Sequence, residues 1–353
     1  MVERKPFVKG PVKSGEKIRS TLADAGLLDS DFRIIRVKDD LYLPLETDVS
    51  KEEVEEILDS MDYELGIREF ESVVEGPRSL EEALEDKLDP EEIELLPRAY
   101  DLIGNIAVLE LPEGLEQYDQ LIGQSFLSIH PHFSTVLAKR GAISGIKRTR
   151  SYKFLAGEKK TSTIHTEYGL DIAVDLSKAY FSPRLLEEHR RVAEQVQDNE
   201  LVVDMFTGVG PFALHIAKKT EARVVAIDIN RNAVKLLEKS ITLNRLSGTI
   251  KCIVADADEY VQSHYYKDVD RVIMNHPSAA SDYVGTACKA LKSGGILHYY
   301  DFISEPEPEE KAGDRILYLI EESGHQAEEI LHIRRVRDSA PYEYQMAVDV
   351  LVI

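Results

Sequence analysis

Leu201-Val202-Val203-Asp204-Met205-Phe206-Thr207-Gly208-Val209-Gly210-Pro211 is the stretch of this sequence that decides its fold. A short apolar run ends in an acid and enters a loop with two glycines, and the proline suits the first turn of a helix. This pattern indicates a buried strand, a tight turn and a helix, with the loop facing a ligand at the carboxyl end of the strand. A dinucleotide site would need a third glycine, but Phe212-Ala213 follows, which disfavours NAD.

The residues around this loop repeat the alternation of strand and helix. Strands are expected over 201–205, 223–228, 250–255, 270–274 and 295–300, and helices over 184–197, 211–219, 231–244 and 281–291. Strands separated by helices pair in parallel through right-handed crossovers. Residues 181–353 are therefore expected to form a doubly wound α/β sheet. The segments 327–336 and 344–351, around Ala340-Pro341, predict an antiparallel hairpin that closes the sheet edge.

Three successive strands of this region end in an acid: Asp204, Asp228 and Asp256. Any one of them is more often a helix N-cap or a turn residue. The set in this order indicates a ligand, because Asp204 suits the α-ammonium group of S-adenosylmethionine, Asp228 the ribose hydroxyls and Asp256 the adenine amino group. The predicted fold is a Rossmann-like class I S-adenosylmethionine domain, and the predicted cofactor-binding residues are Arg184, Asp204, Phe206, Gly208, Gly210, Pro211, Asp228, Ile229, Asp256, Ala257, Asn275 and Pro277.

The fourth strand ends in Asn275-His276-Pro277-Ser278. In nucleobase methyltransferases an Asn-x-Pro at this place presents an amide and constrained carbonyls to the edge of a base. A plain turn is the competing explanation, since Asn and Pro both favour turns. The preceding acids favour the functional interpretation. His276 could pass for a general base, but a single histidine in a turn is more often structural or exposed to solvent.

The sequence before residue 181 divides into three parts. Residues 1–72 mix helical and strand patterns and predict a small α+β module. Residues 73–97 carry prolines among many acids and predict a linker. Residues 98–180 contain strand-like runs separated by glycines and charged turns, which predicts a mostly β middle domain.

The charge distribution bears on the partner. A net charge of −21 argues against a polyanion, because it repels one at long range. Residues 139–160, however, hold eight Lys or Arg and one acid. A solvated loop is the plain explanation of such a run. The alternative is an RNA-binding patch made by Lys139, Arg140, Lys147, Arg150, Lys153, Lys159 and Lys160.

Composition excludes several classes of protein. No run of 18 apolar residues is present to cross a bilayer, and the first residues carry charges without an apolar segment after them, so a cytoplasmic protein is expected. Cys252 and Cys288 are too few for a disulfide framework or a zinc cluster, and no metal is expected.

These motifs, with Asn105-Ile106-Ala107, Thr163-Ile164-His165, Tyr180-Phe181-Ser182-Pro183-Arg184 and Ser339-Ala340-Pro341, resemble the archaeal and eukaryotic tRNA (guanine-N1)-methyltransferase family. That family acts on the guanosine at tRNA position 37. The resemblance covers nearly the whole chain. It implies S-adenosylmethionine as methyl donor, and tRNA as partner, held at the outer corner by the first module and at the anticodon stem-loop by the middle domain. A monomer is expected.

The resemblance also implies catalytic residues. By motif position the catalytic arginine is Arg148 and the acid is Glu188, and Asn275 would hold the base edge. Guanine N1 carries a proton at neutral pH, so we expect Glu188 to accept that proton and Arg148 to neutralise the charge on O6. The chain departs from the family at His276, where an apolar residue is common, and at Tyr168, where a polar one is usual.

Three alternatives stay open from the sequence. The first is the related transfer of the aminocarboxypropyl group of the same cofactor in wybutosine synthesis, against which Glu188 and Asn275-x-Pro277 argue. The second is a tRNA-binding protein without catalysis, which the intact strand-end acids disfavour. The third is a small-molecule methyltransferase, which leaves residues 1–170 without a role.

Overall fold

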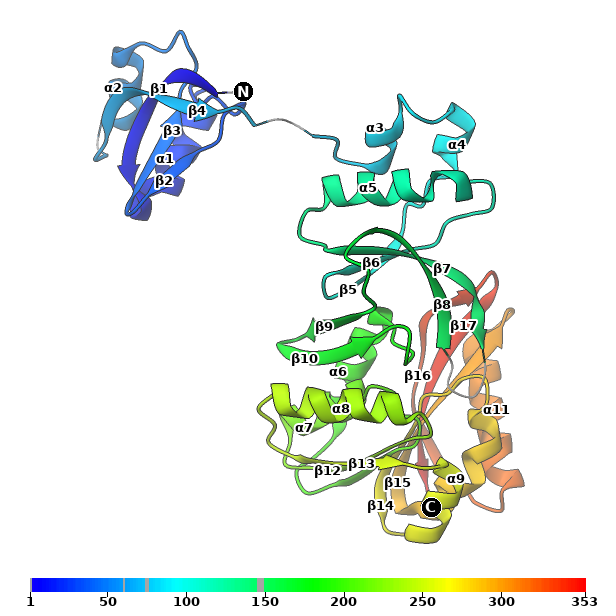
Figure 1. The fold of residues 1–353 in the computed structure, drawn as a ribbon. Coiled ribbons are helices and arrows are strands. Elements are labelled where there is room, and N and C mark those ends of the chain that lie inside the picture. The colour runs from blue at the N-terminus through cyan, green and yellow to red at the C-terminus, as the bar shows by residue number, and fades with distance from the viewer. Residues whose placement is uncertain (1, 60, 74–75, 145–148) are drawn as a thin grey trace. The chain divides into compact units, whose positions relative to one another are not determined.

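The computed structural model describes residues 2–59, 61–73, 76–144 and 149–353 (Figure 1). The chain divides into two compact units, Met1–Ala83 and Leu84–Ile353. Each is described by itself.

The first unit is an antiparallel sheet covered by helices. Its strand order is β2-β3-β1-β4, in which β1 (Val2–Pro11) pairs with both β3 (Asp40–Pro44) and β4 (Glu64–Glu71), and β2 (Ile35–Val37) lies at the edge. Helices α1 (Val12–Asp24) and α2 (Lys51–Leu58) contribute buried Ile18, Leu22, Val54 and Leu58 to its core. The α+β class of this module agrees with the prediction. The sequence did not predict strands β1 and β4, because charged residues interrupt their apolar pattern.

The boundary between the units falls at the end of the short helix α3 (Leu80–Leu84), and the second unit continues with α4 (Pro90–Glu94). A four-stranded sheet follows in the order β5 (Tyr100–Ile103), β6 (Ile106–Leu109), β7 (Thr135–Ser144), β8 (Thr149–Gly157). After the 3₁₀ turn η1 (Glu116–Tyr118), helix α5 (Asp119–Ile129) packs on β7 and β8. A hairpin of β9 (Ser162–Glu167) and β10 (Leu170–Asp175) leads out of this sheet. The middle region is therefore mostly β, as expected, with one helix that the sequence did not predict.

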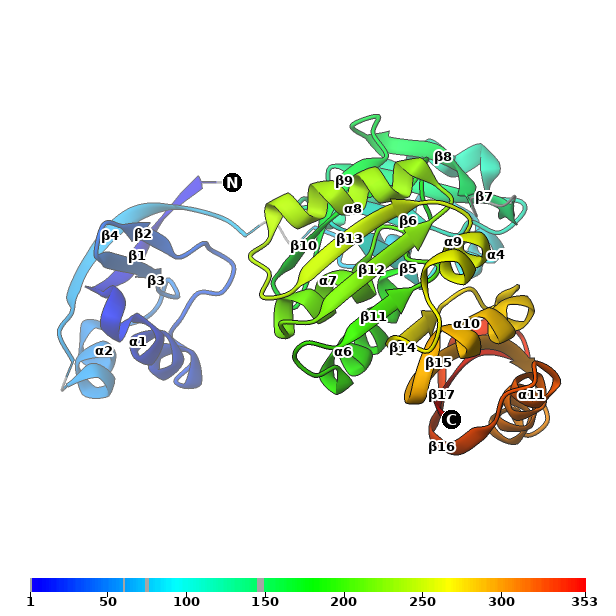
Figure 2. The ribbon, with the colours of Figure 1, turned by 90° about the horizontal axis from the view of Figure 1, so that it is seen from below.

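The largest sheet has seven strands in the order β13-β12-β11-β14-β15-β17-β16 (Figure 2). Five pair in parallel: β11 (Leu201–Asp204), β12 (Arg223–Asp228), β13 (Thr249–Val254), β14 (Val269–Met274) and β15 (Leu291–Ser304). The other two, β16 (Ala327–Ala340) and β17 (Glu343–Val352), form an antiparallel hairpin at the edge. Both the doubly wound sheet and the closing hairpin are confirmed.

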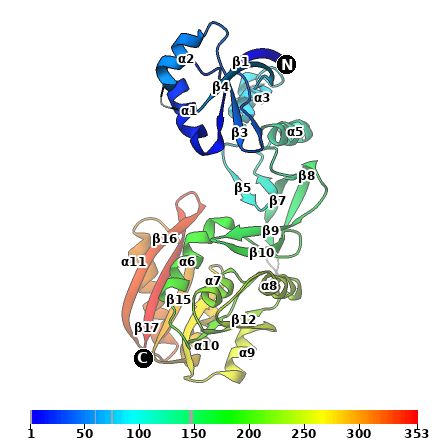
Figure 3. The same cartoon turned by 90° about the vertical axis from the view of Figure 1, so that its left-hand side faces the viewer.

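Helices cover both faces of this sheet (Figures 2 and 3). Val202 and Val224 contribute to the same core as helices α6 (Leu186–Gln195), α7 (Pro211–Lys219) and α8 (Arg231–Leu243). The alternate residues Val203 and Val225 join the core under α9 (Ala257–His264), α10 (Val284–Ala290) and α11 (Pro308–Glu322). Both faces of a buried parallel strand are apolar, which explains the continuous runs in the sequence. The 3₁₀ turns η2 (Pro183–Leu185) and η3 (Ala280–Tyr283) precede α6 and α10. In the described ranges, every helix is too short or too polar to cross a membrane.

Candidate functional site

The glycine loop after β11 turns in the way that its sequence predicts. Gly208 and Gly210 have φ values of 56° and 79°, which are strained for residues with a side chain. A Cβ atom on Gly210 would also lie 2.2 Å from Leu237 Cδ1. Gly210 lets the loop turn and lets the start of α7 approach Leu237 of α8. It is not among the residues that line the cavity described next, and its cofactor contact stays a prediction.

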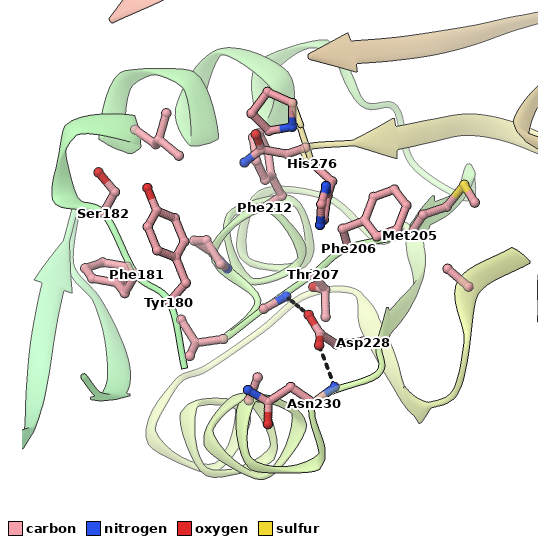
Figure 4. Close-up of a pocket in the computed structure, with 18 of the residues that line it drawn as sticks. Tyr180, Phe181, Ser182, Met205, Phe206, Thr207, Phe212, Asp228, Asn230 and His276 are labelled. Atoms are coloured by element: carbon pink, nitrogen blue, oxygen red, sulfur yellow. Dashed lines mark hydrogen bonds between the residues drawn. The ribbon is translucent and has the colours of Figure 1, made fainter. Parts of the chain in front are cut away.

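A cavity opens at the carboxyl ends of strands β11, β12, β13 and β14, where doubly wound folds bind ligands (Figure 4). The structure brings most of the predicted cofactor-binding residues to its wall. They are Phe206, Gly208, Pro211, Asp228, Ile229, Asp256, Ala257, Asn275 and Pro277.

Asp228 is the best-defined polar group of this cavity. Its carboxylate accepts hydrogen bonds from the backbone N–H groups of Gly208, at 2.8 Å, and Asn230, at 2.7 Å (Figure 4). Burial raises the pKa of Asp228, and the two backbone hydrogen bonds oppose that rise. Each oxygen keeps a lone pair for a further donor, so the two hydroxyls of a ribose are suitable partners.

Asp256 combines two roles. Its side chain accepts hydrogen bonds from the backbone N–H groups of Asp258, at 2.9 Å, and Glu259, at 3.3 Å, and so caps α9. It also lines the cavity. Asp256 is therefore a helix N-cap, which is the plain explanation of an acid at a strand end. Its position on the cavity wall also suits a contact with an adenine amino group.

Asp204 is not among the residues that line the cavity, although its neighbours Met205 and Phe206 are, and its contact with an ammonium group stays a prediction. The side chain is fully buried, and neither carboxylate oxygen has a hydrogen-bond partner of normal geometry within the described ranges. Burial raises its pKa to about 7, against the lowering effect of the Thr207 hydroxyl and the Phe206 backbone. The Asp204 carboxyl group is therefore only partly ionised near neutral pH when no cation lies beside it.

Three rings form an aromatic wall on the same cavity. The ring centroid of Phe206 lies 5.1 Å from that of His276 and 5.2 Å from that of Tyr283. Such a wall suits a flat heteroaromatic ligand, because tilted and edge-to-face ring contacts are favourable at these distances. His276 therefore lines this cavity, whereas the sequence alone left its role open.

A buried acid positions another part of the wall. Glu167 Oε2 lies 2.9 Å from His189 Nδ1 and 3.0 Å from His215 Nε2, and all three residues are buried. Burial alone raises the pKa of Glu167, but the two histidine hydrogen bonds lower it to about 2. His189 lines the cavity and meets Phe212 edge to face at 4.8 Å between ring centroids. The charged Glu167 thus fixes His189 from behind.

A second cavity shares wall residues with the first and is lined by residues of the four-stranded and the seven-stranded sheets. It shares Tyr180, Phe181, Ser182, His276, Tyr283 and Arg337 with the first cavity. Arg184 lies on its wall and pairs with Asp101 at 2.7 Å. Arg184 is not among the residues that line the first cavity, and its cofactor contact stays a prediction.

Glu188 lies in a buried ion cluster on α6. Its carboxylate accepts hydrogen bonds from Arg191 Nη2, at 2.6 Å, and the Tyr300 hydroxyl, at 2.7 Å, and its exposed fraction is 1%. Arg191 also pairs with Asp349. Glu188 lines neither cavity. To reach a substrate, it has to leave these partners. Arg148, predicted to act with it, lies outside the described residues, as does Lys147.

Acids neutralise much of the predicted basic patch. Lys139 pairs with Asp101 at 2.9 Å, Arg140 and Lys153 pair with Asp119, and Lys160 pairs with Glu158 at 2.7 Å. Lys159 is exposed, and Arg150 lines the second cavity. The patch therefore presents less free positive charge than its sequence suggests.

The structure adds site residues that sequence reasoning missed. Asn230 could have been found as the N-cap of α8, two residues after a strand-end acid. Tyr180 lies in the Tyr180-Phe181-Ser182-Pro183-Arg184 motif and lines both cavities, a role that the sequence did not indicate. Arg337 and Gln345 come from the predicted hairpin, and no local signal in the sequence marks them as part of the cavity wall.

Comparison with known families gives three matches along the chain. Residues 163–328 match the TRM5/TYW2 methyltransferase domain, residues 80–161 match the TYW2 N-terminal domain, and residues 8–55 match the tRNA methyltransferase 5 N-terminal domain.

Individual relatives agree with this pattern. The tRNA (guanine(37)-N(1))-methyltransferase Trm5b of Pyrococcus abyssi is 38% identical over 97% of this chain and 97% of its own. The tRNA(Phe) (4-demethylwyosine(37)-C(7)) aminocarboxypropyltransferase of Pyrococcus horikoshii is 29% identical over 77% of this chain and 96% of its own. The solved complex of aTrm5 and tRNALeu is 34% identical, covers 98% of this chain and 99% of its own, and superposes with a TM-score of 0.72.

Proposed function

Because the chain belongs to the TRM5/TYW2 family, we propose that it is a tRNA (guanine(37)-N1)-methyltransferase that takes its methyl group from S-adenosylmethionine. The observation that carries this proposal is the similarity to Trm5b over almost the full length of both chains. A small-molecule methyltransferase would not explain the match of residues 8–55 to the tRNA methyltransferase 5 N-terminal domain.

The reach of the similarity favours methyl transfer over aminocarboxypropyl transfer. The Trm5b relative matches 97% of this chain, the first module included, whereas the aminocarboxypropyltransferase matches 77%. Identity is also higher with the methyltransferase, at 38% against 29%. The match of residues 80–161 to a TYW2 domain fits a middle region shared by both activities.

The first cavity fits S-adenosylmethionine. The Asp228 carboxylate, already fixed by two backbone N–H groups, would accept the ribose hydroxyls. Asp256, Ala257 and Ile229 would surround the adenine, with the exposed Ile229 side chain as an apolar contact. The cofactor supplies an electrophilic methyl group on a sulfonium. The buried Asp204 beneath the loop would ionise more readily beside a cation, since an opposite charge lowers the pKa of a carboxyl group.

The second cavity would receive the target nucleoside. It opens next to the first, and the two share Tyr180 and His276. A base that enters it has to leave its stack in the anticodon loop, at a cost of a few kcal/mol. Asn275 lines the first cavity next to His276, which lines both, and its amide would hold the edge of that base from there.

For the reaction itself we propose the two catalytic roles that the motif positions imply. Glu188 accepts the N1 proton, and Arg148 stabilises the charge that develops on O6. The hydrogen bonds of Glu188 to Arg191 and Tyr300 require its side chain to turn when substrate binds. Most of the rate acceleration would come from alignment of N1 with the methyl group.

The tRNA would contact the middle region through the least neutralised cations, Lys159 and Arg150. Lys139, Arg140, Lys153 and Lys160 would have to exchange their carboxylate partners for phosphates. We further propose a monomer that works in the cytoplasm, where tRNA is modified.

Two labels on the cofactor test the proposed reaction. With a tRNA transcript, label in the methyl group of S-adenosylmethionine should enter the tRNA, and label in the carboxyl group should not. Incorporation of the carboxyl label would establish aminocarboxypropyl transfer instead. Incorporation of neither label, with cofactor binding intact, would favour the non-catalytic tRNA-binding protein.

A further inference from the structure

A chain of three side chains links the edge of the large sheet to the cofactor cavity. Arg337 on β16 and Gln345 on β17 are cross-strand partners. The Arg337 Nε–H donates to Gln345 Oε1 at 2.7 Å, and Gln345 Nε2 donates to Asn275 Oδ1 at 3.0 Å. Gln345 is 1% exposed, so its amide has little access to water as an alternative partner.

The chemistry of arginine sets the direction of this chain. A guanidinium group has only donors, so the atom of Gln345 that faces Arg337 has to be its oxygen. The NH₂ group of Gln345 then points to Asn275 and needs an acceptor, which is Asn275 Oδ1. A flip of either amide would place two N–H donors against each other in a buried site, which is unfavourable. The orientation therefore follows from the partners and does not depend on telling O from N by position.

Arg337 is itself held in place. Its Nη2 donates to the Tyr180 hydroxyl at 3.1 Å, and its Nη1 donates to Ser182 Oγ at 3.4 Å. Both partners lie in the segment before η2 and line both cavities. The guanidinium thus has contacts on the hairpin and on the opposite wall, and its Nε–H stays directed at Gln345.

We propose that Arg337 and Gln345 are positioning residues that lock the Asn275 amide with its NH₂ group toward the substrate, so that the site selects a base with a carbonyl oxygen at that edge. This inference rests on the proposed function. Guanine presents the acceptor O6 next to N1, and adenine presents an amino group in the same place. An NH₂ group facing that position bonds guanine and meets adenine donor to donor.

The orientation also assists the reaction. When N1 of guanine loses its proton, negative charge moves to O6. A fixed N–H donor at O6 stabilises that charge without having to reorganise. The hydrogen bonds from Arg337 to Gln345 and from Gln345 to Asn275 thereby affect both the choice of base and the rate, through the one bond that Asn275 makes to O6. Neither Arg337 nor Gln345 has to touch the base.

Gln345→Glu should reverse the orientation of the Asn275 amide. The new carboxylate still accepts from Arg337, but it can no longer donate to Asn275 Oδ1. The Asn275 amide then turns its NH₂ group toward that carboxylate and offers Oδ1 to the base. We expect the ratio of kcat/KM for G37 transcripts to that for A37 transcripts to fall at least about tenfold, as for one lost and one opposed hydrogen bond.

A pair of substitutions at Arg337 separates orientation from mere structural support. Arg337→Lys keeps a donor-only partner for Gln345, so the G37 to A37 ratio should stay within about threefold of wild type. Arg337→Gln can donate or accept and no longer sets the direction, so the ratio should fall as in Gln345→Glu. Gln197→Glu, on the exposed loop after α6, is the matched control for the added carboxylate, since the Gln197 side chain bonds only to the Gln195 backbone oxygen among the described residues.

The ratio is measured in single-turnover assays with nucleoside mass spectrometry, next to the thermal transition of each variant. Lower ratios in Gln345→Glu and Arg337→Gln, with Arg337→Lys preserved, support the proposal. An unchanged ratio in a folded Gln345→Glu or Arg337→Gln protein overturns it, whatever the absolute rate. If Gln345→Glu fails to fold, the Arg337 pair decides. A wild-type enzyme that makes no N1-methylguanosine would overturn the proposed function, and this inference with it.

Discussion

Replacement of Glu167 by glutamine should destabilise the second unit of the chain. Glu167 is 1% exposed and accepts hydrogen bonds from His189 and His215 on a single carboxylate oxygen. Its pKa falls from 4.5 to about 2 in the folded protein, because the two histidines outweigh the effect of burial. At about 1.4 kcal/mol per pKa unit, the ionised carboxylate contributes about 3 kcal/mol to the free energy of unfolding.

The pH dependence of this contribution has a definite sign. The folded pKa lies below the unfolded one, so the stabilisation is complete above about pH 4.5 and is lost as the pH falls toward 2. The difference between wild type and Glu167→Gln should therefore be largest near neutral pH and shrink in acid. Glutamine keeps the shape of the side chain and one oxygen that can face both histidines, but it loses the negative charge that strengthens the two hydrogen bonds.

Circular dichroism during guanidinium unfolding measures the effect at several pH values. Glu187→Gln is the matched control, because Glu187 is half-exposed on α6, the helix that carries His189, and its ion pair with Arg190 lies at the surface. We expect a large loss of stability for Glu167→Gln and little change for Glu187→Gln at pH 7.5. Equal transitions for the two variants would refute the claim that the Glu167 cluster anchors the cavity wall.

Three further predictions concern the site. Asp228→Asn loses one acceptor toward the two backbone N–H groups that now hold the carboxylate, so calorimetry should show the Kd of S-adenosylmethionine rising at least about tenfold; a Kd within twofold of wild type would exclude Asp228 as the ribose ligand. Glu188→Gln should lower single-turnover methyl transfer at least about tenfold with tRNA binding little changed, and a rate within twofold of wild type would remove Glu188 as the base. Lys159→Ala with Lys160→Ala should weaken tRNA binding and reduce the slope of log K against log salt by up to about two, whereas an unchanged slope would show that these lysines are only solvated surface.

The core of the last domain could be predicted because local pattern and final packing agree there. The apolar runs that became β11, β12 and β14 are buried on both faces, so nothing interrupts their pattern. The glycine loop and Asp228 could be predicted for a similar reason, because a tight turn at a strand end favours glycine and a bound ribose favours a carboxylate.

The missed elements are those in which tertiary packing outweighs local pattern. Helix α5 contains Gly123, which weakens a helix. A Cβ atom at that position would lie 2.6 Å from Leu155 Cβ, so the glycine is there to let α5 approach β8. Strand β1 contains Glu3, Arg4 and Lys5 in succession, yet it lies inside its sheet because β3 and β4 pair with its two edges.

The site could be predicted only as far as single residues signal their role. One of the two partners that hold Glu188, the Tyr300 hydroxyl, lies 112 positions away in the sequence. Likewise, the acids that neutralise Lys139 and Arg140 are Asp101 and Asp119, which lie in other elements. No sequence pattern reports such pairs, since they form only when the sheets assemble.

The central claim is that this chain methylates N1 of the guanosine at position 37 of tRNA. Its most direct test is nucleoside mass spectrometry of two transcripts that differ only at that position, each incubated with the enzyme and S-adenosylmethionine. The account predicts N1-methylguanosine in the transcript with guanosine at position 37 and none in the transcript with cytidine there. N1-methylguanosine in equal amounts from both, or in neither while the cofactor binds, would contradict it.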